Sequence, residues 1–114
     1  HMSSIWDFSM HLYALERGYR IGYDNFGMMM KNSRMRYLDD SQRIDWLVEV
    51  FKKGYGDQVL VSHDIWCKAQ WKHYGGGGYG HFLRTIVPTL HEKGFTESDI
   101  DLLLVRNPAE LMSY

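Results

Sequence analysis

The fold of this chain is decided by the stretch QVLVSHD at residues 58–64. Aliphatic and β-branched residues fill its first half, which predicts a buried strand over residues 58–63. A short segment containing Tyr and Ile predicts another strand over residues 19–24. Between them, residues 39–53 carry an apolar stripe at helical spacing, with acidic residues first and basic residues last, which predicts a helix. Strands joined by such a helix pair in parallel, so the sequence predicts a βαβ unit of an α/β fold.

The flanking segments predict further helices. Ser3 or Ser4 can cap an N-terminal helix that Gly18 closes with a left-handed turn. In a later helix, Pro88 is expected to kink or restart the backbone, because proline has no amide hydrogen. Asn107 is expected to cap a last short helix, since the proline after it suits the first helical position.

The composition indicates an ordinary globular surface. The chain has 114 residues, 45% hydrophobic and 24% charged, and its net charge of -1 offers no basic surface for nucleic acid. No apolar run approaches the ~20 residues of a membrane span, and no signal peptide is visible. The single cysteine, Cys67, excludes an intrachain disulfide. These features predict a cytoplasmic protein with neither nucleic acid nor a membrane as its partner.

Asp64 is the strongest candidate for chemistry. A carboxylate at the carboxyl end of a buried strand points into the mouth of an α/β site, where it can ligate a metal or act as a general base. An Asp64 that only caps the next turn is an equally open interpretation on spacing alone. His63 points to the opposite face of the strand, so it is expected to be a packed, hydrogen-bonded histidine rather than a second ligand.

Long loops follow both strands, which is where α/β folds place their sites. In the loop at residues 25–38, the methionines at 28–30 form either an apolar lip or, as we expect, a segment packed onto the core. In the next loop, Trp66 and Trp71 are candidates for the apolar walls of a substrate pocket, and packing onto helices is the alternative. The glycine run at residues 75–78 lacks a phosphate-loop pattern and indicates a mobile lid or a tight backbone approach.

Metal-binding motifs are absent from the sequence. It contains no His-x-His, His-Glu-x-x-His or Cys-x-x-Cys. The other histidines are scattered and expected at the surface or at helix caps; they are His11, His73, His81 and His91. Cys67 has no neighbouring histidine that would indicate a thiolate pair, so it is expected to be a buried or incidental thiol.

The Ser-His-Asp strand end at residues 62–64 and the glycine-rich stretch after it form a fairly specific pattern. With supporting segments, this pattern resembles the phosphotriesterase family of the amidohydrolase superfamily, including its lactonase-like and phosphotriesterase-related branches. The segments that carry the resemblance are residues 15–27, 58–64, 72–81, 86–88, 93–94 and 107–108. The resemblance implies the C-terminal segment of a (β/α)8 barrel.

This resemblance implies a hydrolase whose barrel mouth holds two divalent metal ions, with zinc expected, and a bridging hydroxide that attacks a phosphorus or carbonyl centre. It implies that Asp64 binds one metal and accepts a proton. Asp24 and Asn25 match the mouth of the seventh strand, and Trp66 and Trp71 match the loop after the eighth, so these four are expected to contact a small-molecule ester. Many lactonase-like relatives carry arginine where Asn25 stands, which leaves phosphotriesters, lactones and other esters open.

Most of the metal ligands that the resemblance implies have no counterpart here. Missing are the His-x-His of the first strand, the carboxylated lysine of the fourth and the histidine of the fifth. The histidine of the sixth strand falls on His1, which is either a ligand or, as we expect, part of a cloning remnant at residues 1–2. We therefore expect residues 1–114 to form a single partial domain, inactive alone, that docks onto the remaining barrel segment or self-associates.

Two functions remain open on the sequence. The chain is either the C-terminal fragment of a divalent-metal-dependent hydrolase or a non-catalytic, truncated module. Such a module would use exposed apolar faces to bind itself or a partner protein. An upstream reading frame with a His-x-His near its start would favour the hydrolase.

Overall fold

A computed structural model describes residues 1–28, 31–32, 35–36 and 38–113 of the chain. At its centre β1 (Ile21–Tyr23) pairs in parallel with β4 (Val59–Val61), and Ile21 lies opposite Val59 in the register. Helix α2 (Asp40–Lys52) lies between the two strands in sequence. The parallel pair and the α/β class are thus confirmed, with strands shorter than the sequence predicted.

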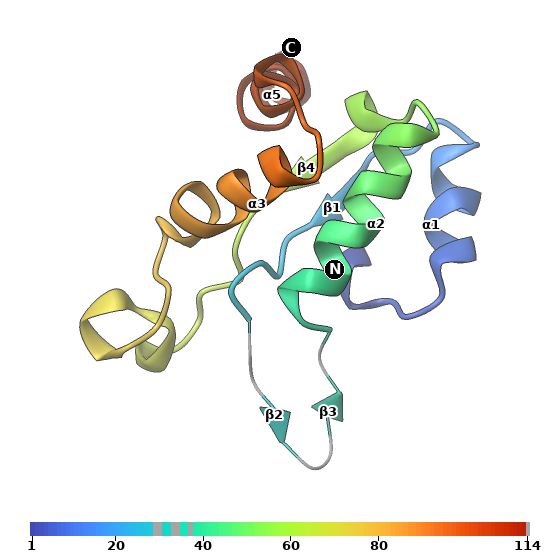
Figure 1. Cartoon of the computed structure of the whole chain (residues 1–114). Helices are drawn as coiled ribbons and strands as arrows, with labels where there is room; N and C mark the ends of the chain where they lie inside the picture. Colours follow the sequence, from blue (N-terminus) through green and yellow to red (C-terminus); the bar gives the residue numbers. More distant parts are fainter. Residues whose placement is uncertain (29–30, 33–34, 37, 114) are drawn as a thin grey trace.

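The remaining elements surround this sheet (Figure 1). They are η1 (Met2–Ser4), α1 (Phe8–Leu15), β2 (Lys31–Asn32), β3 (Met35–Arg36), η2 (Gly56–Gln58), η3 (Lys68–Gln70), η4 (Lys72–Tyr74), η5 (Phe82–Ile86), α3 (Val87–Glu92), α4 (Glu97–Asp101), η6 (Leu102–Arg106) and α5 (Asn107–Met112). The elements η5 and η6 are π-helical turns, and the other η elements are short 3-10 helices. Helices α1 and α2 pack together where Phe8 stacks on Trp46, with ring centroids 6.2 Å apart.

The two faces of the central sheet differ. Ile21, Tyr23 and Val59 are buried in the hydrophobic core beneath the helices. Gly22 and Leu60 lie opposite each other in the register, and both are half-exposed. Because side chains alternate along a strand, these two positions point to the other face.

Helix α2 follows the predicted pattern. Its N-cap Asp39 accepts a hydrogen bond from the Gln42 amide at 3.0 Å, and Gly54, with φ of 84°, follows its last turn. Leu47 and Val50 are fully buried. Each buried aliphatic side chain stabilises the fold by roughly 1.5–3 kcal/mol. Of the predicted stripe, Ile44 and Leu47 are buried and Val48 and Phe51 are partly buried, whereas the buried face also includes Trp46 and Val50.

The N-terminal helix begins later than the sequence suggested. Helix α1 is capped by Asp7, whose carboxylate accepts a hydrogen bond from the Ser9 amide at 2.9 Å. Ser3 and Ser4 lie instead in η1, and their hydroxyls bind side chains at the end of β1. The predicted serine cap was therefore wrong, because those hydroxyls have long-range partners. Gly18, with φ of 77°, does close the segment in the left-handed region.

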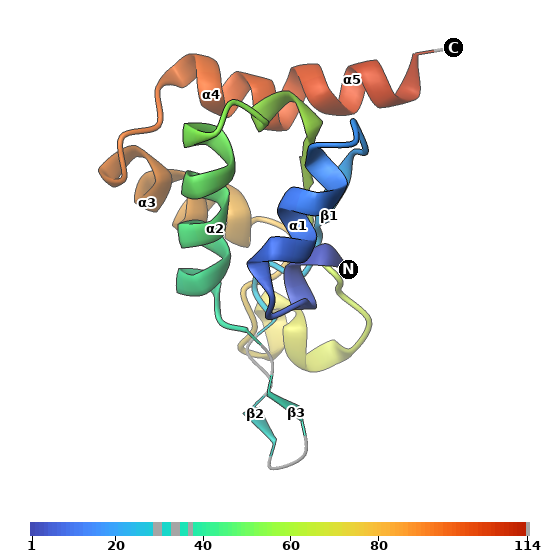
Figure 2. The same cartoon turned by 90° about the vertical axis from the view of Figure 1, so that its right-hand side faces the viewer.

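Both prolines lie inside continuous helices. Turn η5 runs into α3, and α4 runs through η6 into α5, with helical dihedral angles at each junction (Figure 2). Pro88 and Pro108 each stand two residues after the π turn ends. A π turn shifts the backbone hydrogen-bond pattern, which accommodates a residue without an N–H. The restart expected at Pro88 is thus a π turn, and the expectation that Asn107 caps a separate helix was wrong.

The loop after β1 contains the antiparallel hairpin of β2 and β3, which projects away from the helices in Figure 1. At its start Met28 is buried with 4% of its surface exposed, as expected for packing onto the core. Met29 and Met30 lie outside the described residues.

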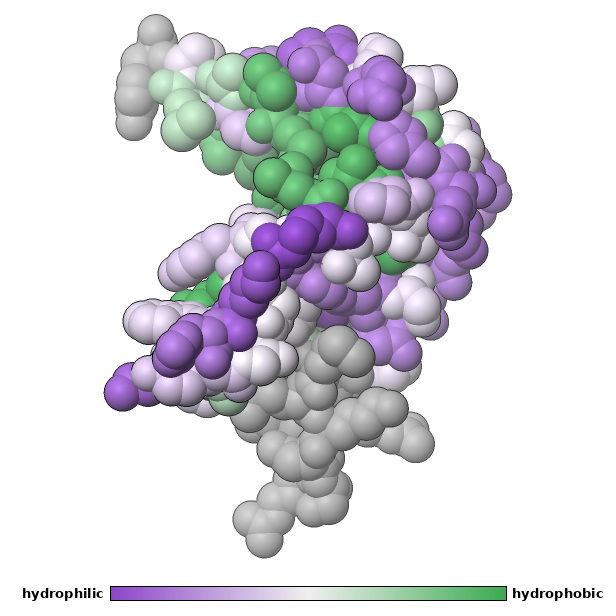
Figure 3. All heavy atoms as spheres, turned by 60° about the vertical axis from the view of Figure 1, so that its left-hand side comes forward, coloured by the Kyte–Doolittle hydropathy of each residue, from purple (hydrophilic) through white to green (hydrophobic). Residues whose placement is uncertain are grey.

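Hydrophobic residues gather on the surface near the C-terminal end of the chain, beside a hollow (Figure 3). Val105, Leu111 and Met112 are 57%, 55% and 67% exposed. A contiguous apolar patch of this kind commonly marks a contact surface. Among the helices that the structure describes, none combines the length and apolarity that crossing a bilayer requires.

Candidate functional site at the carboxyl ends of the parallel strands

The carboxyl ends of β1 and β4 meet at one edge of the sheet, because the strands run in parallel. Asp24 and Asn25 follow β1 directly, and Asp64 follows β4 after two residues. The Asn25 side-chain amide lies 3.5 Å from Asp64 Oδ2 and donates to it. Asp64 keeps 37% of its side chain exposed, so one carboxylate face remains open. The structure thus brings together three residues that the sequence had proposed for the site.

His1 lies beside the same two carboxylates. Its Nδ1 is 2.9 Å from Asp24 Oδ2, and its Nε2 is 3.9 Å from Asp64 Oδ2. The imidazole therefore stands between two acidic groups of adjacent strand ends. The ring is 57% exposed, and both interpretations of His1, a metal ligand and part of a cloning remnant, stay predictions.

Ser3 and Ser4 orient Asn25. Their hydroxyls donate to Asn25 Oδ1 at 2.9 and 2.8 Å, and Ser3 also donates to Asp24 Oδ1 at 3.3 Å. Asn25 is 2% exposed, so its amide oxygen is satisfied by hydroxyls while its nitrogen faces Asp64. Sequence reasoning missed this role because the serines precede Asn25 by more than twenty residues. The one sequence feature that could have indicated this role is that Ser3 and Ser4 lie two and three residues after His1.

Tyr23, the last residue of β1, is held by a buried histidine. Its hydroxyl is 2.6 Å from His11 Nδ1, and His11 Nε2 is 3.0 Å from the Ile5 carbonyl. Burial raises the pKa of Tyr23 and lowers the pKa of His11. The expectation that His11 is a surface or capping residue was wrong, because α1 turns it into the core, where it is fully buried.

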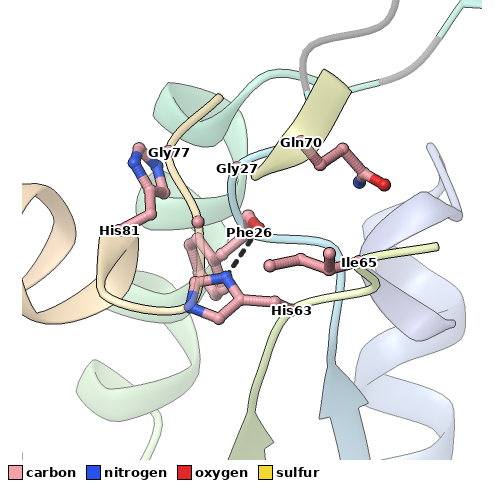
Figure 4. Close-up of a pocket in the computed structure, with 8 residues that line it drawn as sticks. Phe26, Gly27, His63, Ile65, Gln70, Gly77 and His81 are labelled. Carbon is pink, nitrogen blue, oxygen red and sulfur yellow. Dashed lines mark hydrogen bonds between the residues drawn. The ribbon is translucent and has the colours of Figure 1, made fainter. Parts of the chain in front are cut away.

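His63 is a structural hydrogen-bonding residue, as expected. Its Nδ1 lies 2.9 Å from the Phe26 carbonyl (Figure 4). Its Nε2 lies 3.1 Å from the Tyr79 carbonyl. The imidazole thereby joins the segment after β1 to the end of the glycine-rich stretch. A cavity of about 10 Å³ lies next to it, room for about one water molecule.

The glycine run is a tight backbone approach, one of the two readings left open. A Cβ on Gly76 would lie 2.2 Å from the Gln70 carbonyl carbon, which no side chain could occupy. Trp71, 47% exposed, lines an open apolar pocket of about 300 Å³ with Lys72, Gly78 and Tyr79. Trp66 is 63% exposed and lies elsewhere on the loop. Substrate contact by either tryptophan remains a prediction.

The site offers an incomplete set of metal donors. Among the described residues, no group of three or more His, Cys, Asp or Glu side chains is arranged to hold a metal ion. His1, Asp24 and Asp64 are the side chains of those types that the ion pairs bring together at this edge. Cys67 is half-buried, and its sulfur lies 3.5 Å from Gln70 Oε1.

Comparison with known proteins identifies relatives that are much longer. The family model described as the phosphotriesterase family matches residues 1–112. An N-acetyltaurine hydrolase of Dictyostelium discoideum is 33% identical over 96% of this chain, which covers 31% of that relative. The chain therefore spans about a third of the length of the curated relatives it matches.

Solved structures agree with this assignment. A resiniferatoxin-binding protein from Rhodobacter sphaeroides superposes with a TM-score of 0.89 at 25% identity, covering 100% of this chain and 34% of that one. The phosphotriesterase homology protein from Escherichia coli, complexed with phosphate in its active site, gives 0.83 at 30% identity, covering 96% of this chain and 36% of that one. The family model and the solved structures agree. The chain belongs to the phosphotriesterase family and corresponds to about a third of the length of the members it matches.

Proposed function

We propose that this chain is the C-terminal segment of a (β/α)8-barrel hydrolase and supplies one sector of its active-site mouth. The observation that carries the proposal is the meeting of Asp64, Asp24, Asn25 and His1 at the carboxyl ends of two adjacent parallel strands. Barrel enzymes build their sites at this end of the strands. The chain also resembles solved structures of this family that are about three times as long, which supports its being one segment of a barrel.

The donor types support a divalent metal, with zinc as the proposed ion. Zinc accepts imidazole nitrogen and carboxylate oxygen, and Asp64 and His1 present one of each, 3.9 Å apart. A catalytic zinc takes about three protein ligands, so these two residues would hold part of a shell. We propose that the rest of a two-metal centre comes from the remaining barrel. When bound, the metal would supply Lewis-acid activation of water and of the scissile group.

The residues of this chain then have separable tasks. Asp64 is the proposed proton acceptor, since its carboxylate is partly open to the site. Asn25 orients Asp64 through its amide nitrogen, and the two serine hydroxyls fix the amide so that its nitrogen faces the carboxylate. Trp71 lines the apolar pocket beside the glycine run, where it could hold the nonpolar part of a substrate.

The proposed substrates are small molecules with a phosphotriester, lactone or other ester bond. The N-acetyltaurine hydrolase relative adds an amide, since N-acetyltaurine carries an acetyl group on nitrogen. All of these present a phosphoryl or carbonyl centre to an attacking water, so one site geometry suits them. A panel of an aryl phosphotriester, a lactone, an aryl ester and N-acetyltaurine would distinguish the classes.

The test combines assembly, metal and activity. Native mass spectrometry of the purified chain should find it with the remaining barrel polypeptide or as an oligomer carrying stoichiometric metal. In that assembly, Asp64→Ala should lower hydrolysis about a thousandfold or more, with an unchanged unfolding midpoint. Asp57→Ala, at an exposed position in η2, is the matched control and should leave the rate unchanged. Full activity in Asp64→Ala would refute the role of Asp64.

A second candidate is a non-catalytic module that binds a partner or itself. The exposed Val105, Leu111 and Met112, and the hydrophobic surface that Figure 3 shows, favour it. A metal-free species that self-associates, together with an assembly with the remaining barrel polypeptide that turns over no member of the substrate panel, would support this module and refute the hydrolase.

A further inference from the structure

Three hydrogen-bond donors from separate elements converge on the carboxylate of Asp40. The Gly27 amide lies 3.1 Å from each Asp40 oxygen. His81 Nε2 lies 2.7 Å from Oδ2, and Arg43 Nη1 lies 2.7 Å from Oδ1. Asp40 begins α2, Gly27 follows β1, and His81 directly precedes η5. One side chain therefore links the loops at the ends of both strands.

This carboxylate is shielded from solvent. The side chains of Asp40 and His81 are 15% and 14% exposed, and that of Arg43 is fully buried. Charge-assisted hydrogen bonds are stronger than neutral ones, and partial burial strengthens them further. The expectation that His81 is a surface or capping residue was wrong, because Asp40 is forty-one residues away in sequence and only the tertiary fold reveals the contact.

The Gly27 amide belongs to the turn that presents Asn25. Met28 donates its amide to the Asn25 carbonyl at 3.0 Å, and Gly27 has φ of 82°, as the third position of a type II turn requires. A Cβ on Gly27 would also lie 3.1 Å from Cδ2 of His81, so the imidazole closes over this turn. Because Asn25 is the first residue of the turn, an anchor on Gly27 sets where its side chain points.

We infer that Asp40, supported by His81, is a positioning residue for the proposed active site: it anchors the Asn25–Met28 turn and so aims the Asn25 amide at Asp64. Asp40 and His81 touch none of the proposed reacting groups and act only through the turn. The inference deepens the proposed function and rests on it for its catalytic consequence. Its structural part, the anchoring of the turn, stands on the hydrogen bonds alone.

The variants are chosen so that the chain stays folded. Asp40→Ala would leave Arg43 buried without a counter-charge, a change that can unfold the protein. His81→Leu removes the supporting donor, together with the ring contact to His63, and leaves both partners of the Asp40–Arg43 pair in place. His81→Gln is the conservative variant, since its Nε2 can still donate to Asp40. Asp45→Asn, which removes an exposed ion pair of α2 with Lys93, is the matched control.

The anchoring is measured by NMR on the 114-residue chain. His81→Leu should raise the amide exchange rate of Gly27 about tenfold and shift the side-chain amide signals of Asn25. His81→Gln and Asp45→Asn should leave both near the wild-type values. Identical Gly27 exchange and Asn25 signals in His81→Leu and Asp45→Asn would overturn the inference, as would a failure of His81→Gln to restore them.

The catalytic consequence is measured in the assembly that hydrolyses substrate. His81→Leu should lower kcat about tenfold while KM stays within about threefold, because the substrate pocket is untouched. His81→Gln should recover most of kcat. A loss confined to KM would overturn the positioning role. If the wild-type assembly hydrolyses nothing, the proposed function fails, while the Gly27 and Asn25 signals still decide the anchoring.

Discussion

Two buried asparagines contact opposite ends of the same short sheet and have different roles. Asn107, 1% exposed, donates to the backbone carbonyls of Gly56 and Val59 at 2.8 and 2.7 Å, at the amino end of β4. The side chain of Asn25, a residue that is 2% exposed, contacts only other side chains in the described hydrogen bonds, namely those of Ser3, Ser4 and Asp64. A side-chain amide that donates to buried backbone carbonyls stabilises the fold. A side-chain amide that donates to a carboxylate orients that carboxylate, here in the proposed site. If the proposed site is correct, groups that stabilise the fold and groups that act in chemistry lie at opposite ends of the strands.

The largest expected effect on stability comes from breaking the amino-end contact. Asn107→Ala removes the side-chain donor from the buried carbonyls of Gly56 and Val59, of which the Gly56 carbonyl keeps the Val59 amide. The free energy of unfolding should fall by about 2–4 kcal/mol. Chemical denaturation measures this loss. Because the site lies at the other end of the strands, hydrolysis measured well below the unfolding midpoint should stay within about threefold of wild type. A large loss of kcat in this variant would contradict the separation.

Replacing Asn25, at the carboxyl ends of the strands, should have the opposite effect, with a smaller loss of stability and a larger loss of activity. Asn25→Ala loses contacts to two hydroxyls and one carboxylate, and the free energy of unfolding should fall by about 1–2 kcal/mol. The value of kcat should fall about tenfold or more, because Asp64 loses its orienting partner. Steady-state kinetics and denaturation on the same sample give both numbers. A variant that is destabilised like Asn107→Ala but fully active would remove Asn25 from the site.

The free energy of unfolding should depend on pH through His11, which contacts the hydroxyl of Tyr23. Burial lowers the pKa of His11 from its usual 6.5, so the folded state prefers the neutral ring. Stability from this residue is complete above pH 6.5 and is lost as pH falls below that value, because the unfolded chain takes up the proton first. The loss is at most about 1.4 kcal/mol per pH unit.

Denaturation of wild type and His11→Asn at about pH 7.5 and about pH 5 isolates this contribution, because Asn can still bind the Tyr23 hydroxyl but does not titrate. The difference between the two proteins should shrink on acidification. An equal difference at both values would show that His11 does not titrate differently in the folded state.

The smallest effect on stability is expected for an ion pair at the surface, near the amino end of β1. Arg20 Nη2 lies 2.8 Å from Glu110 Oε1, and the glutamate is 66% exposed. Glu110→Gln should change the free energy of unfolding by less than about 1 kcal/mol, and the change should shrink further in high salt. A larger change would mean that the C-terminal helix is held by this pair rather than by its apolar face.

Local sequence patterns were sufficient for the main elements. The stripe of α2, the β-branched run at residues 58–63 and the position of Gly18 and Gly54 follow from propensity and side-chain periodicity. Asp64 at a strand end could likewise be found, because strand direction and loop length are local properties. Parallel pairing followed from the helix between the strands.

Other features depended on contacts between residues far apart in the chain. The serines beside Asn25, the buried His11 and the Asp40–His81 pair join residues separated by 22, 12 and 41 positions, as the contacts of Ser3, Tyr23 and Asp40 record. Local patterns assigned those polar side chains to caps or to the surface, because a cap is the commonest local partner for such groups. The π turns before Pro88 and Pro108 were also not foreseen, since periodicity predicts a helix but not its hydrogen-bond register.

The sequence by itself determined the α/β class, the parallel strand pair and the family, and it predicted Asp64 as the leading site residue. Only the tertiary structure decided which polar groups meet at the strand ends and how the Asn25 turn is anchored. The physical reason is that secondary structure follows from neighbouring residues, whereas a site is made of side chains whose partners lie across the fold.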